Sequence, residues 1–162
     1  MLNARITSNL PLVRKKFNKF FRKYPKLLKI GLELAGLQLR EIILTKTEKG
    51  KNLWDSRFPA YSKSYSEAKG KTVVDLYDKG NMLPNFTSKV LSNKKVQLFF
   101  RNKKQADKAK WHHYGMGKLP ERPFFGYSKK TEKVIRNEFE KFMKRQIKAL
   151  KIWVKEKILQ VI

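Results

Sequence analysis

The chain has 162 residues, which is the size of one ordinary domain with a single hydrophobic core. It contains no cysteine, so disulfide bonds and thiolate metal sites are excluded. No uninterrupted apolar run reaches the roughly 18 residues of a membrane span, and no signal-peptide core follows the first basic residues. We therefore expect a soluble, non-secreted protein without a membrane partner.

The net charge is +26, because 39 lysines and arginines face only 13 acidic residues. Such a chain repels itself and is best tolerated beside a polyanion or an acidic protein surface. The alternative interpretation is a solvated, lysine-rich surface without a partner. The excess of lysine over arginine weighs against specific phosphate recognition, for which the arginine fork is favoured.

Residues 1–24 form a basic arm without an acidic residue. Apolar residues recur at helical spacing from Leu12 to Tyr24, so we predict a short basic amphipathic helix that ends before Pro25. Such a helix is marginal alone and needs a surface, which is its own domain, a neighbouring subunit or a polyanion. The candidate polyanion contacts are Arg14, Lys15, Lys16, Lys19, Arg22 and Lys23.

Residues 25–162 are predicted to form one α+β domain. Pro25 opens a helix from Lys26 to Thr45 that is apolar on most sides, so we expect it to be buried between a sheet and an adjacent subunit. Residues 46–75 are predicted to be a long irregular loop. We expect its aromatic residues to anchor the loop rather than to stack on bases: Trp54, Phe58, Tyr61 and Tyr65.

Residues 83–91 and 96–100 are predicted to pair as an antiparallel hairpin. A short helix should follow from Asn102 to Tyr114 and end at Gly115 as its C-cap. Ser128 is a candidate N-cap for a last helix that runs to Ile162. The expected fold is a small antiparallel β-sheet packed against a long N-terminal-half helix and a long C-terminal helix.

The last helix would be about 45 Å long at 1.5 Å per residue, which exceeds what a domain of this size can cover. We therefore expect its far end to reach another subunit or to bend back. Trp153 and Ile158 are the candidate contact residues at that end.

Residues 111–127 concentrate three glycines, two prolines, five aromatic residues and two histidines. The glycines can adopt backbone angles closed to other residues, and the prolines extend the residues before them. We interpret this stretch as a rigid loop. Arg122 lies between its prolines and is predicted to be a fixed donor, either across a subunit boundary or to backbone carbonyls. The alternative is an exposed loop charge.

Candidate catalytic chemistry is sparse. Adjacent residues on a helix point about 100° apart, so His112 and His113 cannot chelate one metal ion without further ligands. A histidine hydrogen-bonded within the loop is the simpler interpretation. Asp75 and Asp78 are interpreted as polar residues flanking the turn at Gly80. We predict no enzymatic activity, no catalytic residue, no metal and no cofactor.

Three stretches in one order resemble a known family. Residues 113–126 hold His-Tyr-Gly and then Leu-Pro-Glu-Arg-Pro-Phe-Phe-Gly, and residues 76–83 hold Leu-Tyr-Asp-Lys-Gly-Asn-Met-Leu. Residues 58–65 hold Phe-Pro-Ala-Tyr-Ser-Lys-Ser-Tyr and are followed by Lys69-Gly70-Lys71. Together they resemble the signatures of the tailed-phage virion morphogenesis proteins, the tail-completion or neck family. Lys79 departs from this pattern, because a small hydroxyl residue is usual there.

The resemblance implies a structural virion protein, a ring-forming neck, head-tail connector or tail-completion component at the passage of the genome. It implies a homo-oligomeric ring, portal, adaptor or tail proteins as partners, contact with packaged DNA, and a place in the virion after assembly in the host cytoplasm. A basic nucleic-acid-binding protein, acting as monomer or dimer, is the alternative. We expect the loop to act in assembly and not in folding, through His113, Gly115, Pro120, Arg122, Pro123 and Phe124.

Overall fold

The computed structural model describes residues 10–77, 79–92 and 94–159, and in helical stretches 10–17, 19–21, 23 and 150–159 it describes the backbone alone. Two strands form an antiparallel hairpin and the remaining regular structure is helical, so the predicted α+β class is confirmed. The elements are α1 (Leu10–Glu48), α2 (Lys63–Lys69), the 3-10 turn η1 (Leu83–Asn85), β1 (Phe86–Ser92), β2 (Lys95–Phe100), α3 (Lys103–Tyr114) and α4 (Lys129–Leu159).

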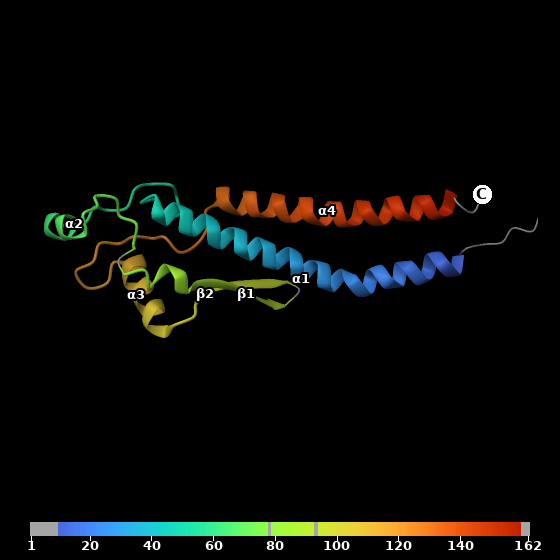
Figure 1. Cartoon of the computed structure of the whole chain (residues 1–162), viewed down its shortest axis with the longest axis horizontal. Helices are drawn as coiled ribbons and strands as arrows, with labels where there is room; N and C mark the ends of the chain where they lie inside the picture. Colours follow the sequence, from blue (N-terminus) through green and yellow to red (C-terminus); the bar gives the residue numbers. More distant parts are fainter. Residues whose placement is uncertain (1–9, 78, 93, 160–162) are drawn as a thin grey trace, which may run out of the picture.

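Helix α1 is one helix of 39 residues with Pro25 inside it, so the predicted break between two helices is wrong. A proline removes one intrahelical hydrogen bond and clashes with the preceding turn, which bends a helix. The axis of α1 changes direction within its blue part in Figure 1. Because helix formation is cooperative, the many hydrogen bonds on both sides offset the one that proline removes.

Helix α1 lies between the hairpin and α4, which runs antiparallel to it (Figure 1). Two glycines allow this close approach on both sides. A Cβ atom on Gly31 would lie 2.7 Å from the Phe139 ring of α4, and one on Gly36 would lie 2.7 Å from the Val96 side chain of β2. Five residues turn a helix by about 140°, so these glycines open nearly opposite faces.

A third face of α1 stays uncovered. Ile30, Leu34 and Leu37 recur at helical spacing and are each about half exposed. The helix was predicted to be buried on most sides, whereas the described residues leave this stripe of it half exposed. The expected contact of this face with an adjacent subunit remains a prediction.

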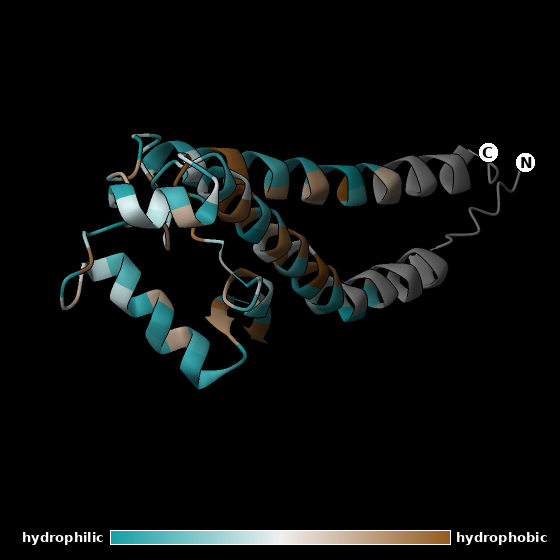
Figure 2. Cartoon of the chain, turned by 60° about the vertical axis from the view of Figure 1, so that its left-hand side comes forward, coloured by the Kyte–Doolittle hydropathy of each residue, from teal (hydrophilic) through white to brown (hydrophobic). Residues whose placement is uncertain are grey.

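The core lies where α1 meets the hairpin and the loop before α4. Figure 2 shows hydrophobic residues gathered along α1 and in the strands, whereas α3 is mostly hydrophilic. Phe86 is fully buried, and its ring centroid lies 5.1 Å from that of Phe100 and 5.4 Å from that of Phe125. The buried cluster consists of Ile43, Phe58, Val74, Leu76, Met82, Leu83, Phe86, Ala109 and Phe124.

The predicted hairpin is confirmed, with Phe86 paired to Phe100 at its base and a shift in register between Val90 and Ser92. Its first strand begins three residues later than predicted, because residues 83–85 form a 3-10 turn that contains Pro84. Proline lacks the N–H that a strand residue donates, which places it before the strand.

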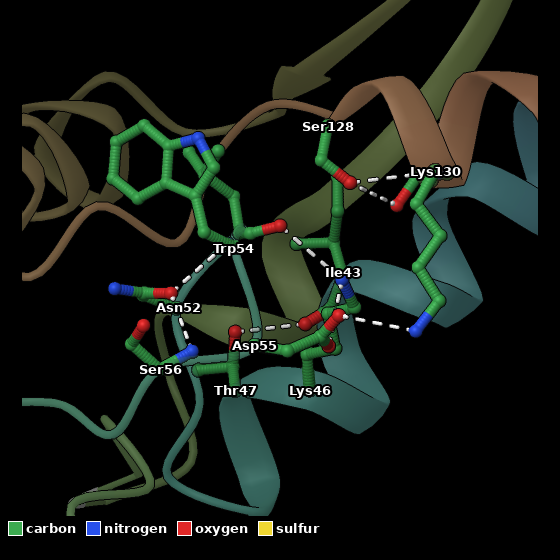
Figure 3. A network of polar contacts seen from close by, with 11 residues as sticks. Ile43, Lys46, Thr47, Asn52, Trp54, Asp55, Ser56, Ser128 and Lys130 are labelled. Atoms are coloured by element: carbon green, nitrogen blue, oxygen red, sulfur yellow. Dashed lines mark hydrogen bonds and ion pairs between the residues drawn. The ribbon is translucent and has the colours of Figure 1, made fainter.

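The end of α1 and the start of α4 are joined through the loop between α1 and α2 (Figure 3). The Asp55 carboxylate lies 2.9 Å from Lys46 Nζ of α1 and 3.7 Å from Lys130 Nζ of α4. Asn52 Oδ1 accepts hydrogen bonds from the backbone N–H groups of Trp54 and Ser56, at 2.9 and 3.0 Å. These contacts hold the turn that presents Asp55 to both helices.

The predicted N-cap of the last helix is also confirmed. The hydroxyl of Ser128 accepts a hydrogen bond from the Thr131 backbone N–H at 3.3 Å (Figure 3 shows Ser128). Helix α4 then runs for 31 residues, about 46 Å at 1.5 Å per residue. The side chains of Trp153 and Ile158 lie outside the described residues, so their predicted contact remains a prediction.

The predicted loop of residues 46–75 is largely irregular but contains the short helix α2. Ser62 caps its first turn, and Gly70 ends it with a left-handed backbone at φ 65°. Phe58 is buried and Tyr61 is partly buried, as expected for anchors. Trp54 is 62 % exposed, so its predicted role as an anchor is wrong. The reason is local, because the Asn52 turn and the Asp55 ion pairs already hold this part of the loop.

Candidate functional site

The site begins at the end of α3. Gly115 has φ 63° and ends the helix as predicted, and a Cβ atom there would lie 2.6 Å from the backbone nitrogen of Glu121. The chain then folds back, because the Arg122 N–H donates to the His112 carbonyl at 2.8 Å. The glycine is therefore required both for its backbone angle and for this close return of the loop.

Arg122 is 2 % exposed, so the alternative of an exposed loop charge is wrong. Its Nε donates to the carbonyl of Pro59 and its Nη2 to that of Ala60, both at 3.2 Å. Its guanidinium also lies over the Tyr61 ring, 5.1 Å from the centroid. The predicted interpretation as a donor to backbone carbonyls is confirmed within this chain.

These bonds revise the expectation that the loop matters only for assembly. Arg122 joins residues 59–61 to the end of α3 from 62 positions away in the sequence, so it stabilises the monomer itself. Burial lowers the pKa of the Arg122 guanidinium, which nevertheless stays charged because an arginine is not deprotonated in proteins. No carboxylate pairs with it among residues 10–159 as described.

A second buried network adjoins Tyr61. Asp75 is 7 % exposed and lies 2.5 Å from Lys69 Nζ, which also donates to the Tyr61 hydroxyl at 3.0 Å. Its Oδ1 accepts the Tyr77 N–H at 3.0 Å. Burial alone would raise the pKa of Asp75, but the hydrogen bonds from Lys69, Tyr77 and Lys71 outweigh it and lower this pKa. The interpretation of Asp75 as a polar turn residue is wrong, and Asp78 lies outside the described residues.

Leu76 follows this carboxylate with a left-handed backbone at φ 51° and a buried side chain. An ordinary L-residue adopts this conformation only at a cost of about 1–2 kcal/mol. This cost is offset in two ways. Leu76 joins the core cluster, and the Asp75 carboxylate accepts a hydrogen bond from the backbone N–H of Tyr77. The next residue, Tyr77, is partly exposed and lines the same cavity as Arg122 and residues of α3.

Three of the remaining predicted loop residues, His113, Pro123 and Phe124, have structural roles inside the chain. His113 Nδ1 accepts the Phe125 N–H at 3.2 Å, which confirms the interpretation of a histidine hydrogen-bonded in the loop. Burial lowers the pKa of this histidine. The Pro123 carbonyl accepts the Leu53 N–H at 3.0 Å, and Phe124 is buried in the core. Pro120 is exposed at the rim of the cavity described next.

A cavity of about 340 Å³ lies between α2, the loop after it, α3 and the glycine-rich loop. Its wall has three basic side chains, Lys108, Lys118 and Arg122, and no acidic side chain. The other residues of the wall are Ala60, Tyr61, Ser62, Tyr65, Leu76, Tyr77, His112, Leu119 and Pro120.

His112 also belongs to this wall. Burial, with smaller contributions from Arg122 and Lys108, lowers the pKa of His112 to about 4, so its ring is neutral at pH 7. Its Nδ1 is buried and has no hydrogen-bond partner in the described part of the chain. The structure brings His112 and Arg122 together in this wall, whereas His113 binds the Phe125 N–H and is not part of the wall.

The candidate polyanion contacts lie far from this cavity, in the first half of α1. Arg22 is exposed. The side chains of Arg14, Lys15, Lys16, Lys19 and Lys23 lie outside the described residues. The arm therefore contributes nothing to the cavity wall as described.

Within the described ranges, no group of three or more His, Asp or Glu side chains is placed to hold a metal ion. No helix in the same part of the chain is long and apolar enough to cross a membrane.

Comparison with known proteins gives no relative: no family model, no curated protein and no solved structure matches this chain.

The positions of three charged residues in this region were not predicted from the sequence. Lys108 precedes His112 by four residues on α3, so the sequence predicts that both side chains lie on one face of the helix. Nothing in the sequence indicated that this face lines a cavity. Lys118 comes to the same wall only through the return of the loop. The Val-Asp-Leu order around Asp75, with lysines four and six residues before it, was the available signal for a buried ion pair.

Proposed function

We propose that this chain is a structural, ring-forming component of a tailed-phage virion, at the neck or at tail completion. One observation carries the proposal. The three stretches that resemble the family signatures converge in space, because Arg122 binds the carbonyls of Pro59 and Ala60 while Tyr61 contacts the Lys69–Asp75 pair that precedes Leu76. Residues that are distant in sequence thus form one framework, which is what a shared structural signature requires.

Exposed apolar side chains supply surface for assembly. Trp111, Tyr114 and Tyr127 are each more than half exposed on or beside the rigid loop. The stripe of Ile30, Leu34 and Leu37 on α1 adds a second such surface. Large exposed aromatic residues on a fixed framework favour protein contacts, since little conformational entropy is lost when they bind.

The proposal is tested on the full chain by light scattering after size exclusion and by electron microscopy. We expect a closed ring, and a monomer at every concentration up to the millimolar range would overturn the proposal. Tyr114→Ala and Tyr127→Ala should weaken the ring and leave the melting temperature of the monomer unchanged. Val73→Ala, which alters an exposed residue after α2, is the matched control and should assemble normally.

Nucleic-acid binding is the second candidate, favoured by the net charge of +26. The two proposals differ in one readout. A ring that assembles without nucleic acid supports the structural role, whereas a monomer or dimer that binds duplex DNA supports the alternative.

A further inference from the structure

The cavity beside Arg122 has an unbalanced charge. Three cations contribute to its wall, and none of them pairs with a carboxylate in the part of the chain that the structure describes. Arg122 is almost completely buried, and buried charges in proteins are ordinarily paired. Low-dielectric walls of one sign concentrate a field that attracts anions.

Donors remain available on this wall. Arg122 uses Nε and Nη2 for the carbonyls of Pro59 and Ala60, and its Nη1 has no partner among the described residues. The side chains of Lys108 and Lys118 likewise have no hydrogen bond or ion pair among the described residues. His112 lies on the same wall, and its Nδ1 is buried without a partner in the described part of the chain. A planar guanidinium with a free amino group suits a carboxylate, which has matching geometry.

The other residues of the wall indicate which kind of molecule supplies the anionic group. Leu76, Leu119 and the rings of Tyr61 and Tyr77 surround the cations with apolar surface, and the volume lies within the range of about 300–1,000 Å³ typical of ligand pockets. A nucleic-acid strand is bound by cations and aromatic residues that follow the backbone along a groove. One walled cavity fits a single inserted side chain better than a continuous strand.

We propose that this cavity binds an acidic side chain, flanked by apolar residues, from a segment of a partner protein. The carboxylate faces Arg122, Lys108 and Lys118, and the flanking residues contact Leu119 and the tyrosine rings. This binding does not depend on the virion role, because it follows from the chemistry of the wall.

The test uses the full chain and a capped pentapeptide, acetyl-Ala-Leu-Glu-Leu-Ala-amide, with its Gln counterpart as the uncharged probe. We expect the Glu peptide to bind and to shift the nuclear magnetic resonance signals of His112 and Ala60, while the Gln peptide leaves them unchanged. Lys108→Gln and Lys118→Gln should each weaken binding by roughly threefold, as for a single partly exposed ion pair. Lys110→Gln, an exposed change of equal charge on α3, is the control and should bind as the parent does.

The His112 ring gives a second, local readout. A bound carboxylate stabilises the imidazolium, so the pKa of His112 should rise from about 4 when the Glu peptide is added. Equal binding of the Glu and Gln peptides, or equal weakening by Lys110→Gln, would overturn the proposal. So would a ten-residue oligothymidylate that displaces the peptide and shifts the His112 signals, since the site would then recognise phosphate.

Discussion

At the scale of single residues, Arg122 explains why the loop is rich in glycine and proline. Its guanidinium donates to the carbonyls of Pro59 and Ala60, while its backbone N–H donates to the His112 carbonyl at the end of α3. Gly115 permits the return that makes both contacts compatible. The charge is thus placed by backbone geometry, and it also forms part of the cavity wall.

Replacing Arg122 with Ala should lower the free energy of unfolding by about 1–3 kcal/mol, because it removes two partly buried hydrogen bonds that a charged donor makes to the carbonyls of Pro59 and Ala60. Urea denaturation measures the effect. Arg101→Ala, an exposed change of equal charge after β2, should stay within about 0.5 kcal/mol of the parent. Equal stability of the two variants would show that the hydrogen bonds of Arg122 contribute nothing.

The Lys69–Asp75 pair makes stability depend on pH. The pKa of Asp75 is lower in the folded protein than its ordinary value of 3.8, so its contribution is complete above that pH and is lost as pH falls through the folded pKa. Asp75→Asn should cost about 3 kcal/mol at pH 7, since it leaves a mostly buried lysine unpaired. Urea curves from pH 7 to pH 3 should show this difference shrinking at the acidic end.

The exposed Asp107→Asn on α3 is the control for that measurement and should show a small, constant difference. A cost for Asp75→Asn that stays the same at pH 3 would mean that the carboxylate charge is not what stabilises the fold.

At the scale of elements, α1 organises the molecule because two of its faces are covered by different partners. Gly36 faces β2 and Gly31 faces α4. Glycine lowers helix stability by about 1 kcal/mol relative to alanine, so two glycines within a helix indicate that close packing offsets this cost.

Gly36→Leu should therefore lower the free energy of unfolding by about 1–3 kcal/mol, although leucine is the better helix former. The added side chain would meet Val96 and Ser88 and separate α1 from the hairpin. Leu37→Ala, at the neighbouring and half-exposed position, should change stability far less. Thermal unfolding of both variants decides the matter, and a more stable Gly36→Leu variant would contradict this packing.

At the scale of the whole molecule, charge and length shape what the chain can do. Helix α4 and the first half of α1 both extend beyond the hairpin (Figure 1). The six candidate polyanion contacts of the arm belong to this part of α1, away from the cavity. Any contact with a polyanion through the arm is thus separate from binding at the cavity.

Replacing the six arm residues with Gln should weaken duplex DNA binding and flatten its dependence on salt, because fewer counterions are released. Substitution is preferable to truncation here, since α1 continues through Pro25. Fluorescence anisotropy at two salt concentrations measures both effects. The matched control replaces six exposed lysines elsewhere: Lys103, Lys104, Lys110, Lys129, Lys133 and Lys148. Equal weakening by both sets would mean that total charge, and not the arm, governs binding.

Local physics made several features predictable from sequence. The hairpin follows from alternating side chains and a polar turn, and the ends of α3 and α4 follow from Gly115 and Ser128, because caps and turns depend on nearby residues. The hydrogen-bonded state of His113 also followed from its loop. These contacts lie within about a dozen positions along the chain.

Tertiary contacts decided the rest. The burial of Arg122 and Asp75, the exposure of Trp54 and the continuity of α1 through Pro25 depend on which distant segments pack together. The residues next to Arg122 in the sequence do not determine whether its side chain reaches a carbonyl 62 positions away. The sequence alone therefore specified the local elements and the net charge, whereas only the fold decided where the charges are buried, because burial is a property of packing between elements.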